Sequence, residues 1–231
     1  MNFWDDYHNI YDKFLMLSPT YNKMVSNIIN DLDLKKDLKI LDAGCGTGYL
    51  SKKLLDAGCD VFSVDYSRNA LSIFSDRVNE AKIYHVDLSR KLFFNDNMFD
   101  KIVCVNALYA IGSQSINSAV DEFYRILKKD GVIIITDPKE NFNNFKIFLS
   151  DIKLWKNNKG LFSVGYFLIR NLLIYIKLFF YNRKIDNNAR DNIYKFFNEQ
   201  QYSDLFKNHG FNVISIKNEY AGQNLLIIAE K

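Results

Sequence analysis

The sequence predicts an α/β fold with a doubly wound sheet of seven strands, mostly parallel, that ends in an antiparallel hairpin. Three observations predict it. Short apolar runs alternate with helix patterns between residues 38 and 136, a glycine-rich turn follows the first run, and two strand patterns lie close together at 211–217 and 223–229. Parallel strands need long crossovers, usually helices, whereas strands joined by a short connection pair antiparallel.

The individual elements are predicted from apolar periodicity and from end signals. Gly58 and Gly210 follow two of the helix patterns, and Ser67 is expected to cap the start of another. The expected strands are 38–42, 60–64, 82–86, 99–105 and 132–136, and the expected helices are 48–57, 68–79, 116–128 and 200–208.

Two helical regions lie outside this alternation. The aromatic residues of 3–32 are spaced for one helix face, with a break at Ser18-Pro19-Thr20. A second region interrupts the sheet after its fifth strand pattern. The expected organisation is therefore an N-terminal helical cap at 1–35, a core at 36–138 and 199–231, and a helical lid insertion at 139–198.

Composition excludes several classes of protein. The chain has 30 basic and 27 acidic residues, a net charge of +3, which is too small to indicate nucleic-acid binding. Cys45, Cys59 and Cys104 form no CxxC pair, so we expect buried free thiols and no metal site. The first six residues carry no basic segment ahead of an apolar run, so we expect a cytoplasmic protein.

The main functional signal lies at the end of the first strand pattern. Asp42 ends an apolar run and is followed by the turn Gly44-Cys45-Gly46-Thr47-Gly48. Glycines let the backbone turn sharply and approach a ligand closely. The next strand ends in Asp65, a carboxylate able to bind the two hydroxyls of a ribose. A dinucleotide fingerprint would space its glycines G-x-G-x-x-G, and Asp42 suits a cationic amine rather than a phosphate. The pattern indicates a nucleoside-binding site.

Three motifs in order carry a family resemblance. The segment 42–48 looks like the first motif of class I S-adenosylmethionine-dependent methyltransferases, and 94–103 resembles the segment before and along their fourth strand. Residues 123–135 are similar to their helix and turn leading into strand five. The resemblance is close over 36–138 and loose over the final hairpin. It implies a Rossmann-like fold, S-adenosylmethionine as cofactor with S-adenosylhomocysteine as product, and kinship with type 11-like methyltransferases of small molecules and lipids.

The resemblance also implies roles for particular residues. The turn and the carboxylate before it would face the methionine portion of the cofactor. Asp65 would hold the ribose hydroxyls, and Tyr66 would lie against the adenine. Asp87 with Leu88 would flank the adenine amine, and Asn106 would lie near the sulfonium. The expected cofactor-binding residues are Asp42, Gly44, Cys45, Gly46, Gly48, Asp65, Tyr66, Asp87, Leu88 and Asn106.

Methyl transfer from a sulfonium is an in-line displacement, for which a protein mainly aligns the nucleophile and excludes water. A neutral amine needs no base, whereas a phenol or a carbon acid does. This chain has Tyr109 where many relatives carry histidine, so histidine-based substrate chemistry is not expected there. The cap either covers the cofactor or packs on the sheet. The alternative to a catalytic role for His8 is a purely structural one. The candidates for a catalytic base are Tyr7, Tyr11, His8 and Tyr109.

The apolar helix expected at 161–181 has three interpretations. It is long enough to span a bilayer, but Arg170 and Lys177 would each cost about 2.5–3.5 kcal/mol at mid-membrane. A lid buried against the domain, an interfacial helix at a membrane or at a lipid-like substrate, and a dimer contact remain open.

The predicted function is transfer of a methyl group from S-adenosylmethionine to nitrogen, oxygen or carbon of a small apolar or lipid-like acceptor. The aromatic cap and the apolar lid helix favour such an acceptor. The alternative is a catalytically inert cofactor-binding subunit that docks on a partner or membrane through 161–181. A monomer or homodimer is expected, with no nucleic acid as partner, in the cytoplasm or peripherally at the inner face of the membrane.

Overall fold

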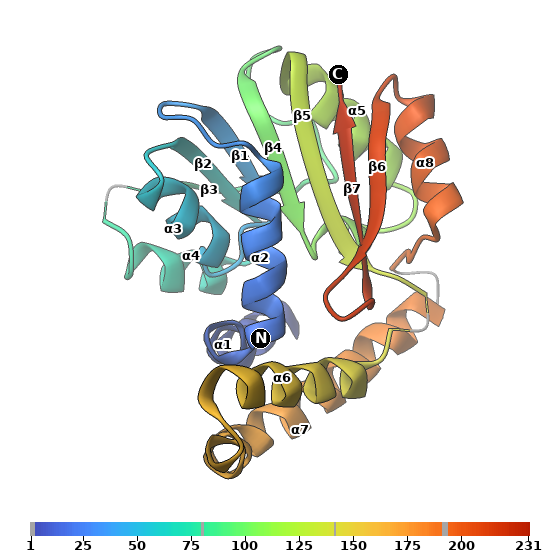
Figure 1. Cartoon of the computed structure of the whole chain (residues 1–231). Coiled ribbons are helices and arrows are strands. Elements are labelled where there is room, and N and C mark those ends of the chain that lie inside the picture. The colour runs from blue at the N-terminus through green and yellow to red at the C-terminus, as the bar shows by residue number, and fades with distance from the viewer. Residues whose placement is uncertain (1–2, 80, 141, 191–193) are drawn as a thin grey trace.

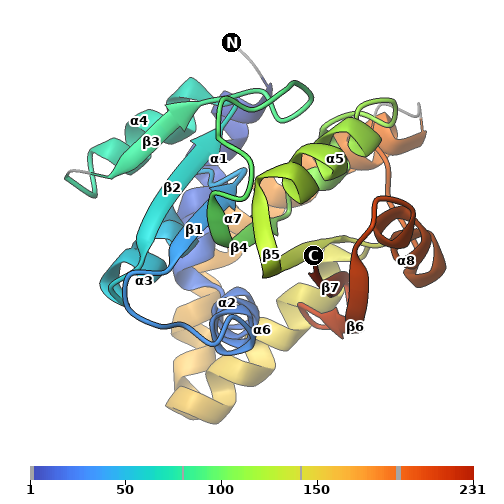
Figure 2. The same cartoon turned by 90° about the horizontal axis from the view of Figure 1, so that it is seen from above.

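The computed structural model describes residues 3–79, 81–140, 142–190 and 194–231; in its first and its longest helix, side chains are described for 7, 10–17, 162–184 and 187. A seven-stranded sheet runs in the order β3-β2-β1-β4-β5-β7-β6, and only β7 is antiparallel to its neighbours (Figures 1 and 2). This confirms the predicted fold. The strands are β1 (Lys39–Ala43), β2 (Asp60–Asp65), β3 (Lys82–His85), β4 (Phe99–Val105), β5 (Leu127–Pro138), β6 (Asn212–Glu219) and β7 (Asn224–Glu230).

The helices follow the predicted order with shifted ends. Expected to reach residue 79, α4 ends at Ser75, because the Phe74 carbonyl accepts the N–H groups of both Arg77 and Val78 and closes the last turn. Strand β5 begins at Leu127, where pairing with Phe99 ends the preceding helix early. The helices are α1 (Phe3–Leu17), α2 (Pro19–Asp31), α3 (Tyr49–Asp56), α4 (Arg68–Ser75), α5 (Ile116–Ile126), α6 (Asn144–Lys159), α7 (Phe162–Arg190) and α8 (Glu199–Asn208), with a short 3-10 turn η1 (Leu108–Ala110).

Both faces of the sheet are covered. In β5, Ile133 and Ile135 face the cluster that contains residues of α5 and α8, whereas Ile134 faces the cluster of α2 and α3. All three side chains are fully buried. A strand buried on both faces is apolar at successive positions, which is why the central strands are continuous apolar runs in the sequence.

The cap and the inserted helices are joined through one buried carboxylate. Figure 1 shows α6 and α7 below the sheet, next to α1. Asp151 of α6 accepts hydrogen bonds from the Ser18 hydroxyl at 2.8 Å, the Thr20 N–H at 2.7 Å and the Tyr175 hydroxyl of α7 at 2.5 Å. Burial raises the pKa of Asp151, which these donors oppose. The division into a cap, a core and a lid remains an interpretation, in which cap and lid share this anchor.

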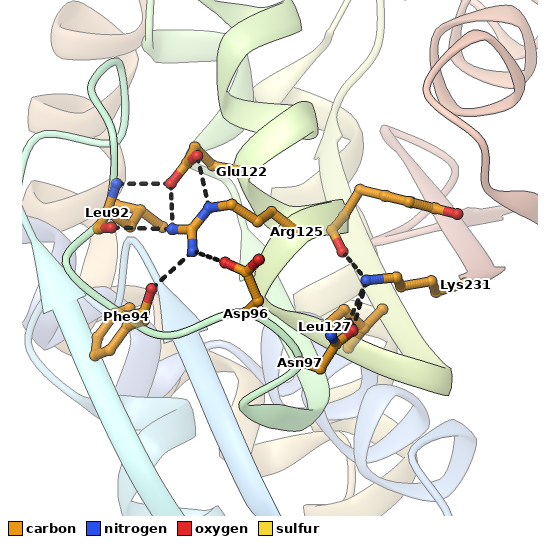
Figure 3. Close-up of polar contacts among 9 residues, drawn as sticks. Leu92, Phe94, Asp96, Asn97, Glu122, Arg125, Leu127 and Lys231 are labelled. Atoms are coloured by element: carbon orange, nitrogen blue, oxygen red, sulfur yellow. Dashed lines mark hydrogen bonds and ion pairs between the residues drawn. The ribbon is translucent and has the colours of Figure 1, made fainter.

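The loop before β4 is fixed to α5 by Arg125 (Figure 3). Its guanidinium donates to both oxygens of Glu122, at 2.9 and 2.7 Å, and to Asp96 at 2.6 Å. It also donates to the carbonyls of Leu92 and Phe94, at 3.0 and 2.8 Å. Only 23% of the Arg125 side chain is exposed, so solvent replaces few of these bonds.

Arg125→Gln is expected to lower the free energy of unfolding by about 3 kcal/mol, because it takes the guanidinium away from two carboxylates and two carbonyls. Lys52→Gln is the control, since Lys52 forms one exposed ion pair with Asp56, and should change stability by less than about 0.5 kcal/mol. Urea unfolding followed by circular dichroism measures both. Equal effects of the two substitutions would show that the Arg125 network contributes nothing beyond a surface ion pair.

Candidate functional site

A cavity of about 590 Å³ lies between the glycine turn, the ends of the parallel strands and the helices α1, α6 and α7. Nine of the ten expected cofactor residues line it, as do Tyr7, Tyr11 and Tyr109. Gly48 does not line the cavity, and the side chain of His8 lies outside the described residues. The cavity stands at the carboxyl ends of the strands, where sheets of this type bind ligands.

The first glycine of the turn has no room for a side chain. Gly44 has φ +78°, and a Cβ there would lie 2.3 Å from the Cβ of Ala107. The N–H groups of Gly44 and Cys45 both donate to the carbonyl of Val64, at 2.8 and 3.0 Å. At Gly48, which precedes α3 with φ +79°, a Cβ would meet the ring of Phe74 at 2.3 Å. Gly48 therefore shapes the turn from behind the cavity.

Asp65 is held in place by the backbone of two turns. The N–H of Gly46 donates to its Oδ2 and the N–H of Ser67 to its Oδ1, both at 2.8 Å. The carboxylate is 9% exposed and lines the cavity. Because a carboxylate has about four acceptor sites, two remain for hydroxyl donors such as those of a ribose.

Asp42 is a buried carboxylate that has no described cationic partner. It is 1% exposed and accepts a hydrogen bond of 2.5 Å from the Ser51 hydroxyl, which also contacts the Ser63 hydroxyl at 2.8 Å. Burial raises the pKa of Asp42 to about 7; the Ser51 hydrogen bond lowers it and the nearby Asp65 charge raises it further. A cationic amine in the cavity would compensate this charge, so the site fits the methionine portion of S-adenosylmethionine.

The end of the cavity near β2 and β3 offers a flat ring and hydrogen-bonding groups. Tyr66 is 57% exposed at the rim, with its ring centroid 5.8 Å from that of His85. Asp87 accepts from the N–H and the hydroxyl of Ser89, at 3.0 and 2.6 Å, and Leu88 is buried beside it. These residues lie together, as contacts to an adenine require.

Asn106 joins three distant parts of the chain. It has φ +55°, and its amide donates to the Tyr11 hydroxyl at 3.2 Å. Its carbonyl oxygen accepts from the Asn224 amide of β7 at 2.6 Å. Asn224 is not among the site residues predicted from the sequence, although a polar residue at the start of an apolar strand pattern is the available signal.

The three described tyrosines among the base candidates line the half of the cavity below the sheet. The rings of Tyr7 and Tyr11 are stacked, with centroids 4.9 Å apart. Burial raises the pKa of Tyr11 to about 12, although the Asn106 hydrogen bond lowers it. Burial and nearby tyrosines raise the pKa of Tyr7 well above its usual value. At neutral pH Tyr7 and Tyr11 therefore keep their protons, and the role of the three tyrosines as bases stays a prediction.

Helix α1 is fixed over the glycine turn by a contact that the sequence did not reveal. Thr47 of the turn donates to Asp12 of α1 at 2.7 Å, and Arg77, just after α4, forms an ion pair with the same carboxylate. Asp12 is buried. The cap is thereby positioned by the same turn that lines the cofactor end.

Strand β5 ends in a buried carboxylate behind the cavity. Asp137 is fully buried and accepts from the N–H of Tyr109 at 3.2 Å and from the hydroxyl of Tyr202 at 2.7 Å. Burial raises its pKa to about 7 against these hydrogen bonds. Pro138, not Asp137, lines the cavity, so Asp137 positions the backbone at Tyr109.

Known proteins resemble this chain in sequence and in fold. The family described as "Methyltransferase domain" matches residues 41–135. An uncharacterized protein of Methanocaldococcus jannaschii is 28% identical, over 83% of this chain and 88% of that protein. A malonyl-[acyl-carrier protein] O-methyltransferase of Buchnera aphidicola is 31% identical over 54% of this chain, which spans only 49% of that enzyme. The solved structure of a TehB-like SAM-dependent methyltransferase from Corynebacterium glutamicum has the same fold, with a TM-score of 0.65 at 15% identity over 98% of this chain and 97% of that one.

The matched domain and the relatives named as methyltransferases support a class I S-adenosylmethionine-dependent methyltransferase, and the solved structure shows the same fold. The class implies S-adenosylmethionine as the methyl donor, and the buried Asp42, the Asp65 carboxylate and the narrow glycine turn fit that group.

Proposed function

We propose that this methyltransferase acts on nitrogen, oxygen or carbon of a small apolar or lipid-like acceptor. One observation carries the proposal: the half of the cavity away from the glycine turn is lined by aromatic and aliphatic side chains and two amides. These lining residues are Tyr7, Tyr11, Phe14, Leu15, Tyr21, Tyr109, Ala110, Ile111, Pro138, Phe142, Asn144, Ile147, Tyr175, Leu178, Asn182, Phe196 and Tyr220.

The charges of the lining disfavour an anionic acceptor. Among the described residues that line the cavity, the acidic ones are Asp42, Asp65 and Asp87, all at the cofactor end, and none is lysine or arginine. A phosphate or carboxylate at the acceptor end would lose its hydration without gaining a counter-ion, which is costly. Tyrosine hydroxyls supply hydrogen bonds to a few polar atoms, as pockets for mainly apolar ligands do.

The residues of the chain then have separate tasks. When bound, S-adenosylmethionine supplies an activated methyl group. Asp42 holds a cationic amine, Asp65 holds ribose hydroxyls, and α1, α6 and α7 exclude water from the acceptor end. A nucleophile that is already unprotonated, such as a neutral amine, needs no base from the protein. Tyr11, with a pKa of about 12, keeps its own proton at neutral pH. An acceptor with a tightly held proton would have to pass it to another base.

The alternative of a catalytically inert subunit is not favoured. Its only distinguishing feature was the apolar helix, whereas the donor end of the cavity has the turn, the two carboxylates and the adenine-side residues together. The family described as a methyltransferase domain also matches this part of the chain, residues 41–135.

The proposal is tested by incubating the protein with methyl-labelled S-adenosylmethionine and an extract of its source cells, followed by solvent partition. Label in the organic phase is expected. Label that stays with polar metabolites or macromolecules would contradict the apolar acceptor, and no transfer to either phase would favour the inert subunit.

Asp65→Ala is the matched loss-of-function variant. It is expected to weaken S-adenosylmethionine binding by about 1–3 kcal/mol, or roughly 5- to 150-fold, because it removes the ribose acceptor. Asp60→Ala, at the far end of the same strand and paired with Lys82, should leave the affinity unchanged. Calorimetry measures both, and equal affinities for the two variants would refute the ribose assignment.

A further inference from the structure

One face of the long helix α7 packs on the domain and the opposite face is exposed. Its inner face contributes Tyr175, Leu178 and Asn182 to the cavity. Its outer face, defined here as Phe162, Ile169, Leu173, Ile176 and Phe180, is exposed, from 43% at Ile176 to 100% at Phe162. At 100° per residue these five side chains fall within a stripe of about 60°. The outer face is therefore a continuous apolar strip on a helix whose other side already packs on the domain.

Exposed apolar side chains concentrate around this strip. Of the fifteen large hydrophobic side chains that are exposed among the described residues, eleven belong to α6, α7 and their connection. The six that extend the outer face are Phe145, Leu149, Leu161, Tyr166, Leu172 and Phe179. A patch of this extent marks an interaction site rather than ordinary surface.

The same segment is strongly basic. Residues 142–190 contain nine of the 30 basic residues of the chain but two of its 27 acidic ones, and one of these two, Asp151, is buried. The rest of the chain has an acidic excess. Arg170 and Lys177 border the outer face on one side, and Lys153, Lys156 and Lys159 are exposed on the neighbouring helix.

We propose that the outer face of α7, with its basic border, docks the protein on the surface of an anionic lipid bilayer. An apolar strip flanked by lysine and arginine is the pattern of a helix that lies in the membrane interface, where lipid charge attracts the basic residues. The membrane would lie opposite the sheet, beyond α7 in Figure 1. Together with the cytoplasmic location expected from the sequence, this would place the protein at the inner face of the membrane.

Two other occupants fit the charges and contacts less well. A second copy would bring two strongly basic surfaces together, and like charges across an interface are costly. A transmembrane span is long enough, since Phe162–Lys184 is the one helix in the described parts of the chain with the length and hydropathy to cross a bilayer. However, a span would carry Arg170 and Lys177 into the membrane and take Tyr175 away from Asp151 and the cavity.

A groove beside the docking surface shares part of its lining with the cavity. This groove of about 350 Å³ is lined by residues that include Phe145, Phe179 and Arg183, and it shares Phe142 and Asn144 with the main cavity. If the proposed function holds, a lipid-like acceptor would enter here from the bilayer, with Arg183 beside an anionic headgroup. Docking itself does not depend on the nature of the acceptor.

Flotation of the whole protein with vesicles tests the docking. Most of the protein is expected to float with vesicles of phosphatidylcholine and phosphatidylglycerol, much less with phosphatidylcholine alone, and high salt should release it. The triple variant Ile169→Gln, Leu173→Gln, Ile176→Gln should reduce the bound fraction at least about tenfold. The control is the double variant Phe93→Gln, Ile214→Gln, which changes exposed apolar residues elsewhere and should float like the wild type.

Calorimetry with S-adenosylmethionine shows whether the triple variant is still folded, and flotation needs no turnover, so a failed acceptor assay leaves this result unaffected. Three results would overturn the docking: a wild type that stays in the aqueous fraction, a triple variant that floats like the wild type, or a dimer in light scattering that the triple variant abolishes. Binding that resists alkaline carbonate would replace surface docking by a span.

Discussion

Asp42→Asn is expected to weaken S-adenosylmethionine binding about 100-fold or more, while making the protein without ligand more stable at pH 8. The two effects have one cause. The carboxylate is buried next to Ser51 with no described cation beside it, and burial raises its pKa from 3.8 to about 7. An amide removes the buried charge, which favours folding, and removes the partner of the cofactor amine, which disfavours binding.

The sign of the stability change follows from the two pKa values. In the unfolded chain Asp42 loses its proton near pH 4, but in the folded chain it keeps the proton until about pH 7. The unliganded wild type therefore loses stability as the pH rises from 4 to 7, by up to about 4 kcal/mol for this group. Asp42→Asn should recover on the order of 2 kcal/mol at pH 8 and nothing at pH 4. Asp137, with a pKa also raised to about 7, retains its own contribution in both proteins.

The affinity for S-adenosylmethionine should also depend on the protonation of Asp42. Because the amine requires the ionised carboxylate, the affinity of the wild type is expected to fall about tenfold between pH 8 and pH 6, whereas that of Asp42→Asn should stay nearly constant. Calorimetry at pH 6, 7 and 8 measures this. Equal pH dependence in both proteins would assign the proton to another group.

Gly44→Ala is expected to destabilise the protein by about 3 kcal/mol or more and to abolish cofactor binding. The new methyl group would lie 2.3 Å from the Cβ of Ala107, a distance that requires one of two backbone segments at the cavity wall to move. The left-handed backbone at φ +78° adds about 1–2 kcal/mol. Gly58→Ala is the matched control, because Gly58 has φ +83° but would meet only the flexible side chain of Lys36, at 3.2 Å.

A double variant separates the clash from the backbone strain. Gly44→Ala combined with Ala107→Gly removes the opposing methyl group, so its stability should return to that of Gly58→Ala, with partial recovery of binding. Chemical unfolding of the wild type, the single variants Gly44→Ala and Ala107→Gly, and the double variant gives the coupling energy between the two positions. No recovery in the double variant would show that strain at φ, and not contact with Ala107, makes glycine necessary here.

The elements predicted well were those with local signals. The turn at 44–48 and the carboxylates at 42 and 65 lie within short motifs at strand ends, so sequence spacing was enough to bring them to one cavity. The apolar strands have a periodicity that needs no partner to be recognised. The start of β5 depended on pairing with Phe99 of β4, and the end of α4 on a turn closed by the Phe74 carbonyl, which apolar periodicity does not reveal, so these boundaries were placed a few residues away.

The acceptor end was less predictable because its residues meet only through tertiary contacts. Tyr21, Tyr175 and Tyr220 come from three distant parts of the chain and face one chamber, yet nothing in their local sequence distinguishes them from other core aromatics. The same holds for Asp151, whose partners are over 130 residues away at Ser18 and Thr20. The apolar character of the helix expected at 161–181 was evident, but only the structure shows which side of it is covered.

The junction at Asn106 has a consequence for the order of events during synthesis. Tyr11 lies 95 residues before Asn106, and Asn224 lies 118 residues after it. Contacts over such separations form late, because long loops must close first. A nascent chain that ends at β5 already carries the glycine turn but has no finished acceptor chamber. Ligand can therefore reinforce the complete chamber only after Asn224 has been synthesised and has reached Asn106.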